Sequence, residues 1–183
     1  MQTVQVCRIL ANLCYNCDEG RRQILENRTC LEMLVEIARG REGRTKTCGE
    51  DPGQRLPAIL PGFLLNFCNG TPDAVKAIGQ LGYIGVISDT VVSTKTNDAV
   101  FNNCLLFLNC LIDEPDSHPY FGEGSEAVTA ALCHVIEHTT SPEVTESALE
   151  LMQGMTNSSE QLILALAKSP HLCKLVMSRI EDR

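Results

Sequence analysis

The segment CRILANLCYN, residues 7–16, forms an apolar helical face around one amide side chain, Asn12, and this arrangement recurs three times along the chain. The recurrences are GFLLNFCNG (62–70), NCLLFLNCLID (103–113) and ALELMQGMTN (148–157). Their amides, Asn66, Asn109 and Gln153, follow at intervals of 54, 43 and 44 residues. A period of about 40–47 residues is typical of units built from two or three helices that stack into a solenoid.

The first interval is longer because residues 40–53, GREGRTKTCGEDPG, form an evident insertion. Removing about ten to twelve of these residues restores the common period. After each amide-bearing helix the sequence predicts a short helix and then a second apolar helix, as in DEGRRQILEN (18–27) and CLEMLVEIAR (30–39). Only IGVISDTVV (84–92) resembles a strand, and an isolated strand has nothing to pair with.

Capping residues predict where individual helices begin. Asp18 is placed to cap the helix of residues 18–27, and Ser141 followed by Pro142 predicts the start of another helix. Pro61 lies about one turn inside its predicted helix, so we expect it to bend that helix or delay its start.

The predicted fold is all-α: an armadillo-type solenoid, a right-handed superhelix of about three to four three-helix repeats. Residues 1–16 are predicted to be the third helix of a preceding repeat, and 157–183 a partial repeat. Between them lie repeats at 17–70, with an inserted loop at 40–54, at 71–113 and at 114–156. Solenoids end in polar capping repeats, and none is visible here, so we expect a piece of a longer array.

Composition places the chain among globular proteins. It has 183 residues, of which 44% are hydrophobic, enough for one domain with a substantial core. No apolar run reaches the roughly 18 residues of a membrane span, and no secretion signal is evident. The ten cysteines lie in apolar helical segments, where a thiol behaves as a small hydrophobic group. These features predict a cytosolic monomer that does not insert into membranes.

The charges are unevenly distributed along the chain. Residues 1–95 contain 11 Lys/Arg and 10 Asp/Glu, whereas residues 96–167 contain 11 Asp/Glu and no Lys or Arg. Such an acidic surface repels nucleic-acid phosphates, so no nucleic acid is expected as a partner, and it attracts basic partners. The simpler alternative is an acidic face that is merely solvated.

Two motifs have the spacing of metal ligands, but neither is complete. Cys14 and Cys17 form a CxxC pair, and a structural zinc site would need a second pair that the sequence lacks. HVIEH, His134 to His138, matches the H-x-x-E-H signature of zinc proteases without an evident third ligand. GEGSEA (122–127) lacks the preceding strand of a dinucleotide-binding loop. We therefore predict no metal, no cofactor and no catalytic residue.

The amides are the main candidates for binding. In stacked three-helix units the third helices line the concave surface, where each amide offers donors and an acceptor to the backbone of an extended partner. Alternatively, each amide binds a neighbouring carbonyl or faces water. The predicted row is Asn12, Asn66, Asn109 and Gln153; one turn earlier come Arg8, Gly62, Leu105 and Leu149, and two turns earlier Gln5, Ile59, Asn102 and Glu146. The groove is thus partly apolar, with an acidic patch of Glu143, Glu146 and Glu150 toward its C-terminal end.

Four longer segments match a known family: CRILANLCYNCDEGRRQI (7–24), LPAILPGFLLNFCNGTPD (56–73), LGYIGVI (81–87) and LLFLNCLIDEPDSHPYF (105–121). Their most specific part is R-x-L-x-N-x-C-Y-x-x-x-E-G-R, from Arg8 to Arg21. Together they resemble the small-GTPase GDP-dissociation stimulator (Smg GDS) family of armadillo-repeat proteins over most of residues 4–121.

The resemblance implies binding of Ras- and Rho-type GTPases that carry a polybasic stretch and a prenyl group at the C-terminus. Family members act as chaperones of these GTPases and, for some of them, as guanine nucleotide exchange factors, in the cytosol and at organelle surfaces. Two other functions stay open. One is an adaptor for a different extended basic peptide, and the other is a metallohydrolase that uses His134 and His138.

Overall fold

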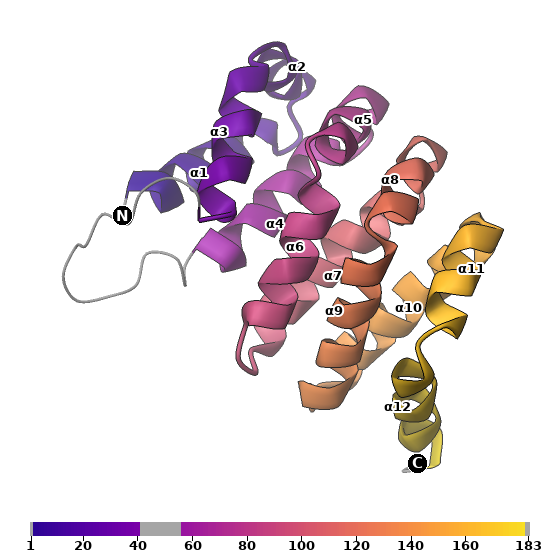
Figure 1. Cartoon of the computed structure of the whole chain (residues 1–183). Helices are drawn as coiled ribbons and strands as arrows, with labels where there is room; N and C mark the ends of the chain where they lie inside the picture. The colour runs from indigo at the N-terminus through magenta and orange to yellow at the C-terminus, as the bar shows by residue number, and fades with distance from the viewer. Residues whose placement is uncertain (1, 41–55, 182–183) are drawn as a thin grey trace.

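The computed structural model describes residues 2–40 and 56–181, which form an all-α solenoid (Figure 1). Its helices are α1 (Gln2–Cys14), α2 (Asp18–Glu26), α3 (Arg28–Ala38), α4 (Leu56–Cys68), α5 (Pro72–Gln80), α6 (Tyr83–Ser93), α7 (Asp98–Ile112), α8 (His118–Glu123), α9 (Ser125–His138), α10 (Pro142–Ser158), α11 (Glu160–Ala167) and α12 (Pro170–Glu181). A 3-10 helix at Pro115–Ser117 precedes α8. These two ranges contain no strand, so the strand-like IGVISDTVV is helical within α6. The predicted all-α solenoid is confirmed.

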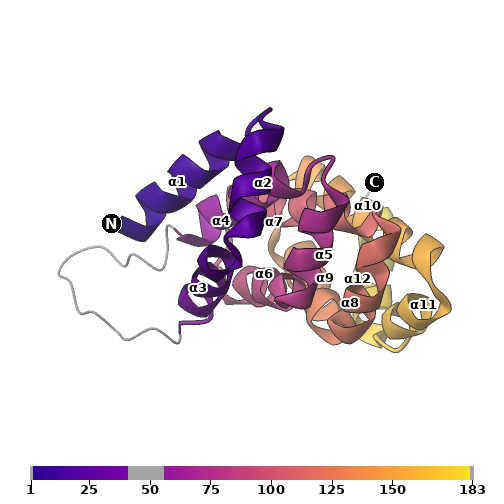
Figure 2. The same ribbon diagram turned by 90° about the horizontal axis from the view of Figure 1, so that it is seen from above.

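The helices form three rows that follow the order of the chain (Figures 1 and 2). In the first row α1, α4, α7 and α10 each pack along the next helix of the row. The second row contains α3, α6, α9 and α12, and the shorter α2, α5, α8 and α11 lie along one edge. We call the solvent-facing surface of α1, α4, α7 and α10 the third-helix face.

The grouping of these helices into repeats remains a prediction from the sequence. It assigns α2–α4, α5–α7 and α8–α10 to three repeats, with α1 before them and α11–α12 after them. The predicted inserted loop at 40–54 lies outside the described residues, apart from its first residue. At the other end, α10 continues to Ser158, two residues beyond the predicted boundary at 156.

Side-chain caps account for several helix starts. The hydroxyl of Ser141 accepts a hydrogen bond from the backbone N–H of Val144 at 3.4 Å, which confirms the predicted start of α10. The prediction for Asp18 is wrong, because α2 begins at Asp18 itself and Cys17 occupies the cap position without a side-chain bond. The carboxylate of Asp18 instead pairs with Arg21 at 2.7 Å, one turn further along α2.

Pro61 does not delay the start of α4, contrary to the expectation from the sequence. The helix begins at Leu56 and runs through Pro61, which is buried. A proline inside a helix lacks the hydrogen bond that its own N–H would have made to the carbonyl four residues earlier, and its ring also crowds that carbonyl. The packing of α4 between α1 and α7 offsets this cost and keeps the helix continuous.

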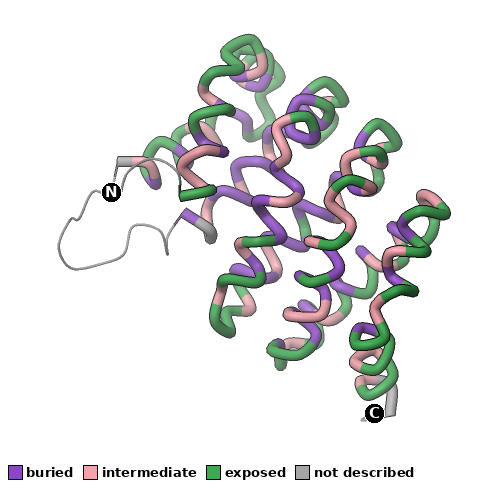
Figure 3. Tube along the Cα trace, in the orientation of Figure 1, coloured by how far each residue is buried: buried purple, intermediate pink, exposed green. Residues whose placement is uncertain are grey.

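The core lies between the rows, where buried residues of neighbouring helices face one another (Figure 3). Its largest fully buried side chains are aromatic: Phe63, Phe67, Tyr83, Phe101, Phe107 and Phe121. The buried hydroxyl of Tyr83 on α6 donates to the carbonyl of Leu31 on α3 at 2.7 Å. In the described part of the chain, every buried side-chain nitrogen and oxygen has a hydrogen-bond partner. None of the described helices is both long and apolar enough to cross a membrane.

The cysteines of the described ranges are free thiols in different environments. Cys14 lies in the core, as expected, and Cys17 is exposed in the turn after α1. Burial raises the pKa of Cys7 and of Cys14 to about 11, and that of Cys104 to about 12. Because the thiolate is the nucleophile, these buried thiols are protected both by their surroundings and by their pKa.

Thiol labelling of the native protein at about pH 8 should therefore be selective. Cys17 and Cys173 should react in a fast phase, whereas Cys14 and Cys104 should react only when the chain unfolds. Peptide mapping by mass spectrometry over a time course measures each site. Labelling in concentrated guanidinium is the control, in which all of these sites should react at similar rates. Native-state labelling of Cys104 as fast as that of Cys17 would contradict the packing of α7.

Candidate partner-binding face

The four predicted amides lie on successive helices of the third-helix row, but they do not share one environment. Asn12 on α1 and Gln153 on α10 are exposed, whereas Asn66 on α4 and Asn109 on α7 are half-buried. The sequence pattern is the same at each site. The difference arises because α4 and α7 each have a neighbouring helix on both sides within the row.

Asn66 and Asn109 each join two helices of this row. The Nδ2 of Asn66 donates to the carbonyl oxygen of Ala11 on α1 at 3.2 Å, and the Nδ2 of Asn109 donates to that of Ser147 on α10 at 3.0 Å. For these two residues the structure shows the alternative arrangement, in which an amide binds a neighbouring carbonyl. Each of these NH2 groups donates one hydrogen bond within the protein, and of the four amides Asn12 and Gln153 are the exposed ones.

Arg21 is a structural residue beside this face that sequence reasoning did not select. Its Nε donates to the carbonyl oxygen of Asn66 at 3.0 Å, and its guanidinium pairs with Asp18. The side chain is almost fully buried, so it fixes α2 against α4. The sequence offered one indication of its importance, because Arg21 is the last residue of the specific pattern that begins at Arg8.

Two leucines make part of the third-helix face apolar. Leu106 on α7 and Leu149 on α10 expose 40% and 39% of their surface. The prediction of Leu105 at this position is wrong, because Leu105 is 1% exposed and belongs to the core. The error of one residue arises because α7 is apolar on several sides, so spacing alone does not define which side faces solvent.

The remaining predicted groove residues differ in exposure along the row. Gln5, Arg8 and Glu146 are exposed, and Ile59, Gly62 and Asn102 are half-buried. Among these predicted residues, the polar ones on α1 are exposed, those on α4 and α7 are half-buried, and Glu146 on α10 is exposed and acidic.

The acidic patch consists of Glu143, Glu146 and Glu150, which are all exposed on α10. Their spacing of three and then four residues places them on one side of the helix. Among the described residues, the ion pairs that form use carboxylates other than these three glutamates. Glu146 and Glu150 also repel each other as like charges one turn apart, so a bound cation would relieve that repulsion.

The two histidines of HVIEH are stacked side by side and do not converge on one point. Their ring centroids lie 4.2 Å apart, and the rings of Phe101 and His134 lie perpendicular to each other with centroids 5.7 Å apart. The Nε2 of His134 lies 2.9 Å from the carbonyl oxygen of Thr94, and the Nδ1 of His138 lies 2.9 Å from that of His134. The described residues contain no group of three His, Cys, Asp or Glu side chains that could hold a metal ion.

A groove of about 890 Å³ between α9 and α11 is a feature that sequence reasoning missed. Its lining includes Glu126 on α9, Glu160 and Leu164 on α11, and Lys168 directly after α11. The groove lies on α9 and α11, which belong to the other two rows, whereas the acidic patch lies on α10. No single segment of the sequence contains its lining, so no local pattern indicated it.

Two curated proteins are similar to this chain. It is 26% identical over 186 residues to the GTPase-GDP dissociation stimulator vimar of Drosophila melanogaster, covering 97% of this chain and 27% of that protein. It is 23% identical over 155 residues to the Rap1 GTPase-GDP dissociation stimulator 1-B of Xenopus laevis, covering 85% of this chain and 24% of that protein. The chain thus spans about a quarter of the length of the curated relatives it matches. No family model matches it, and no solved structure matches it.

Proposed function

We propose that this chain binds small GTPases of the Ras and Rho type and regulates them. The observation that carries the proposal is its similarity, over 97% of its length, to a protein named as a GTPase-GDP dissociation stimulator. The second relative is named as a GDP dissociation stimulator of the Rap1 GTPase. At the level of the family, these names support GTPase regulation; the identity of the GTPase and the mode of binding are our proposals.

The bound segment in this proposal is a polybasic, prenylated C-terminus. The charge distribution supports it, because residues 96–167 contain no Lys or Arg and three exposed glutamates lie together on α10. Exposed ion pairs contribute about 0.2–1 kcal/mol each, so a tail with several basic residues is needed for appreciable affinity. Leu106 and Leu149, exposed on the same face, offer apolar surface to an isoprenoid beside the charges.

Regulation of this kind needs no catalytic side chain in the regulator. A stimulator of GDP release binds the nucleotide-free GTPase more tightly than the GDP-bound form and thereby shifts the equilibrium toward release. A chaperone of prenylated GTPases covers the lipid and the basic tail in the cytosol or near organelle surfaces. Both roles are binding functions, and the third-helix face is the surface that we assign to them.

Replacing Glu143, Glu146 and Glu150 together by glutamine should weaken binding of a polybasic, prenylated peptide about tenfold at low salt. This is the change in affinity expected when several screened ion pairs are lost together. The dependence of affinity on salt concentration should also become flatter. Fluorescence anisotropy with a labelled peptide measures both effects.

The matched control replaces Glu123, Glu126 and Glu137 by glutamine, which changes the net charge equally on α8 and α9. This control should bind nearly as tightly as the unmodified chain. Equal weakening by the two triple variants would show that net charge, and not the α10 patch, attracts the peptide.

The second candidate function is an armadillo-type adaptor for another extended basic peptide, and the same acidic patch favours it. The prenyl group separates the two candidates. A regulator of prenylated GTPases should bind the prenylated peptide more tightly than the same peptide without its lipid. Equal affinity for the two peptides would favour the adaptor.

A further inference from the structure

The groove between α9 and α11 is a second candidate binding site, on different helices from the third-helix face. Its volume of about 890 Å³ is sufficient for a ligand of the size of a short peptide. Thr129 in its lining is buried, and Cys133 and Ala165 are half-buried. These side chains are small, so a ligand can approach both helices closely.

Both helices begin at the same end of the groove. Gln161, in the first turn of α11, packs against Gly122, which lies just before α9, and a Cβ atom on Gly122 would be only 2.9 Å from the Oε1 of Gln161. At the other end, the Sγ of Cys133 on α9 lies 3.7 Å from the Oγ of Ser169, which follows α11. The two helices therefore run in the same direction along the groove.

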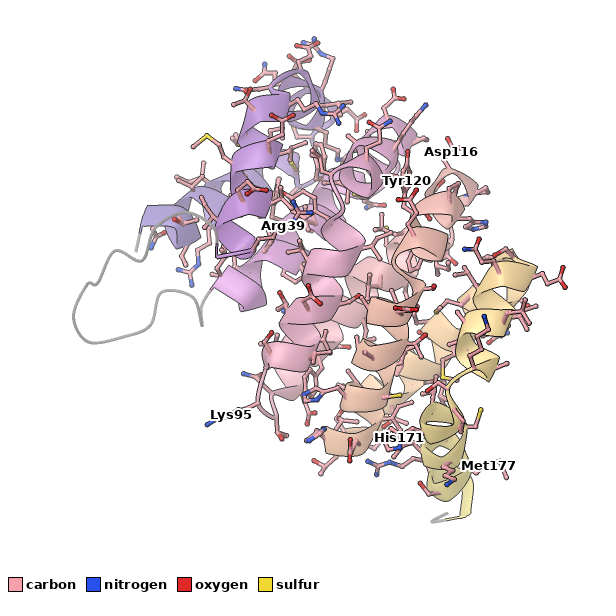
Figure 4. The ribbon with its side chains drawn as sticks, viewed as in Figure 1. Arg39, Lys95, Asp116, Tyr120, His171 and Met177 are labelled. Carbon is pink, nitrogen blue, oxygen red and sulfur yellow. The ribbon has the colours of Figure 1, made fainter. Side chains whose placement is uncertain are left out.

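Gln161 also places a polar group at the start of the groove. A comparable contact with glycine occurs between α8 and α5, where the ring of Tyr120 packs against Gly79 (Figure 4). On α11 a flexible amide makes the contact in place of a rigid ring. The side chain of Gln161 is exposed, so its donors and acceptor can reach a ligand in the groove.

The two ends of the groove carry opposite charges. Glu126 lies in the first turn of α9 and Glu160 is the first residue of α11, whereas Lys168 directly follows α11. All three residues are exposed, and none of them takes part in the ion pairs of the described ranges. The helical rise of about 1.5 Å per residue places Glu160 about 12 Å from Lys168 along α11.

We propose that this groove binds an extended peptide segment with a basic residue at one end, an acidic residue four positions away and a small apolar residue midway between them. In an extended chain, residues i and i+4 lie about 13 Å apart on the same face. The basic side chain lies beside Glu126 and Glu160, and the acidic side chain beside Lys168. The segment thus matches the groove in both spacing and charge.

The lining favours an extended segment over a bound helix. An extended backbone needs hydrogen-bond partners, and the side chains of Ser125, Thr129 and Gln161 supply them along the groove. A helix instead binds through several large apolar side chains in an apolar groove, and Leu164 is the one large aliphatic side chain among the described lining residues. Lys168 also disfavours a uniformly basic tail, so this site does not rest on the proposed function.

NMR titration of the ¹⁵N-labelled chain of residues 1–183 tests the proposal. The probes are two capped five-residue peptides, with lysine and aspartate at opposite ends of three alanines in either order. At least one order should shift the backbone amide signals of Thr129, Ala130 and Leu164. With two exposed ion pairs, the expected dissociation constant is about 1 mM at low salt.

Two variants test the roles of charge and of space in the groove. Lys168→Glu should weaken binding of the preferred peptide about fivefold and shift the preference to a peptide with lysine at both ends. Lys174→Glu, on α12 outside the groove lining, makes the same charge change and should bind like the unmodified chain. Ala130→Trp fills the groove without a change of charge and should abolish binding. Circular dichroism checks that each variant is folded.

Three results would overturn the proposal. The first is the absence of shifts in the groove with either peptide, and the second is an unchanged peptide preference in Lys168→Glu. The third is a shift of the same signals when the concentration of the chain is raised without peptide, because a second copy of the chain would then occupy the groove.

Discussion

Replacing Phe63 by alanine is expected to lower the free energy of unfolding by about 3–5 kcal/mol, the usual cost of truncating a buried phenylalanine. Phe63 is fully buried in α4, and its ring stacks on that of Phe67 with centroids 5.8 Å apart. The truncation would leave a cavity beside α4, which is held in place by α1 on one side and α7 on the other. Urea denaturation followed by circular dichroism measures the change.

Ile9→Ala is the matched control, because Ile9 occupies the equivalent position of α1, 54 residues earlier. Its side chain is mostly exposed, so the free energy of unfolding should change by no more than about 0.5 kcal/mol. Similar losses in the two variants would show that Ile9 is covered in the isolated chain, contrary to its exposure in the structure.

Replacing Gly20 by alanine should destabilise the protein by about 1–3 kcal/mol, the range typical of overpacking. Gly20 lies in the first turn of α2, where a Cβ atom would overlap the backbone carbonyl of Leu13 in the last turn of α1. A helix carbonyl cannot rotate away as a flexible side chain could, so α2 would have to move. That movement would also strain the hydrogen bond between Arg21 and the carbonyl of Asn66.

Gly85→Ala in α6 is the control for the substitution itself. A Cβ atom on Gly85 would have no atom within 4 Å beyond its own helix and chain neighbours, so alanine should gain up to about 1 kcal/mol of helix propensity. Thermal unfolding should therefore shift in opposite directions for the two variants. A stable Gly20→Ala protein would indicate that α2 packs less closely on α1 than the structure shows.

The general fold could be predicted from the sequence because its signals are local and repeated. The period of the amide-bearing segments indicated stacked helices, and the pair Ser141 and Pro142 marked the start of α10 correctly. The cap of α2 could not be predicted in this way. Asp18 is suited both to a cap position and to the first turn of a helix. In the structure it lies in the first turn of α2, where it forms an ion pair with Arg21.

The candidate site was harder to predict, because exposure depends on neighbours that the sequence does not specify. A helical pattern places Asn66 and Asn109 at equivalent positions to Asn12, but it does not show that a carbonyl of the adjacent helix lies within reach. In α7, Leu105 and Leu106 are chemically identical, so only packing decides which of them is exposed. The groove between α9 and α11 has the same origin, since two separate segments form it.

The order of packing in the third-helix row limits how its two ends can influence each other. Each helix packs along its immediate neighbours, so α4 and α7 separate α1 from α10 within the row. The stability of a stacked array is approximately a sum of local terms and nearest-neighbour interfaces, so we expect a displacement of α1 to weaken at each interface that it crosses on the way to α10.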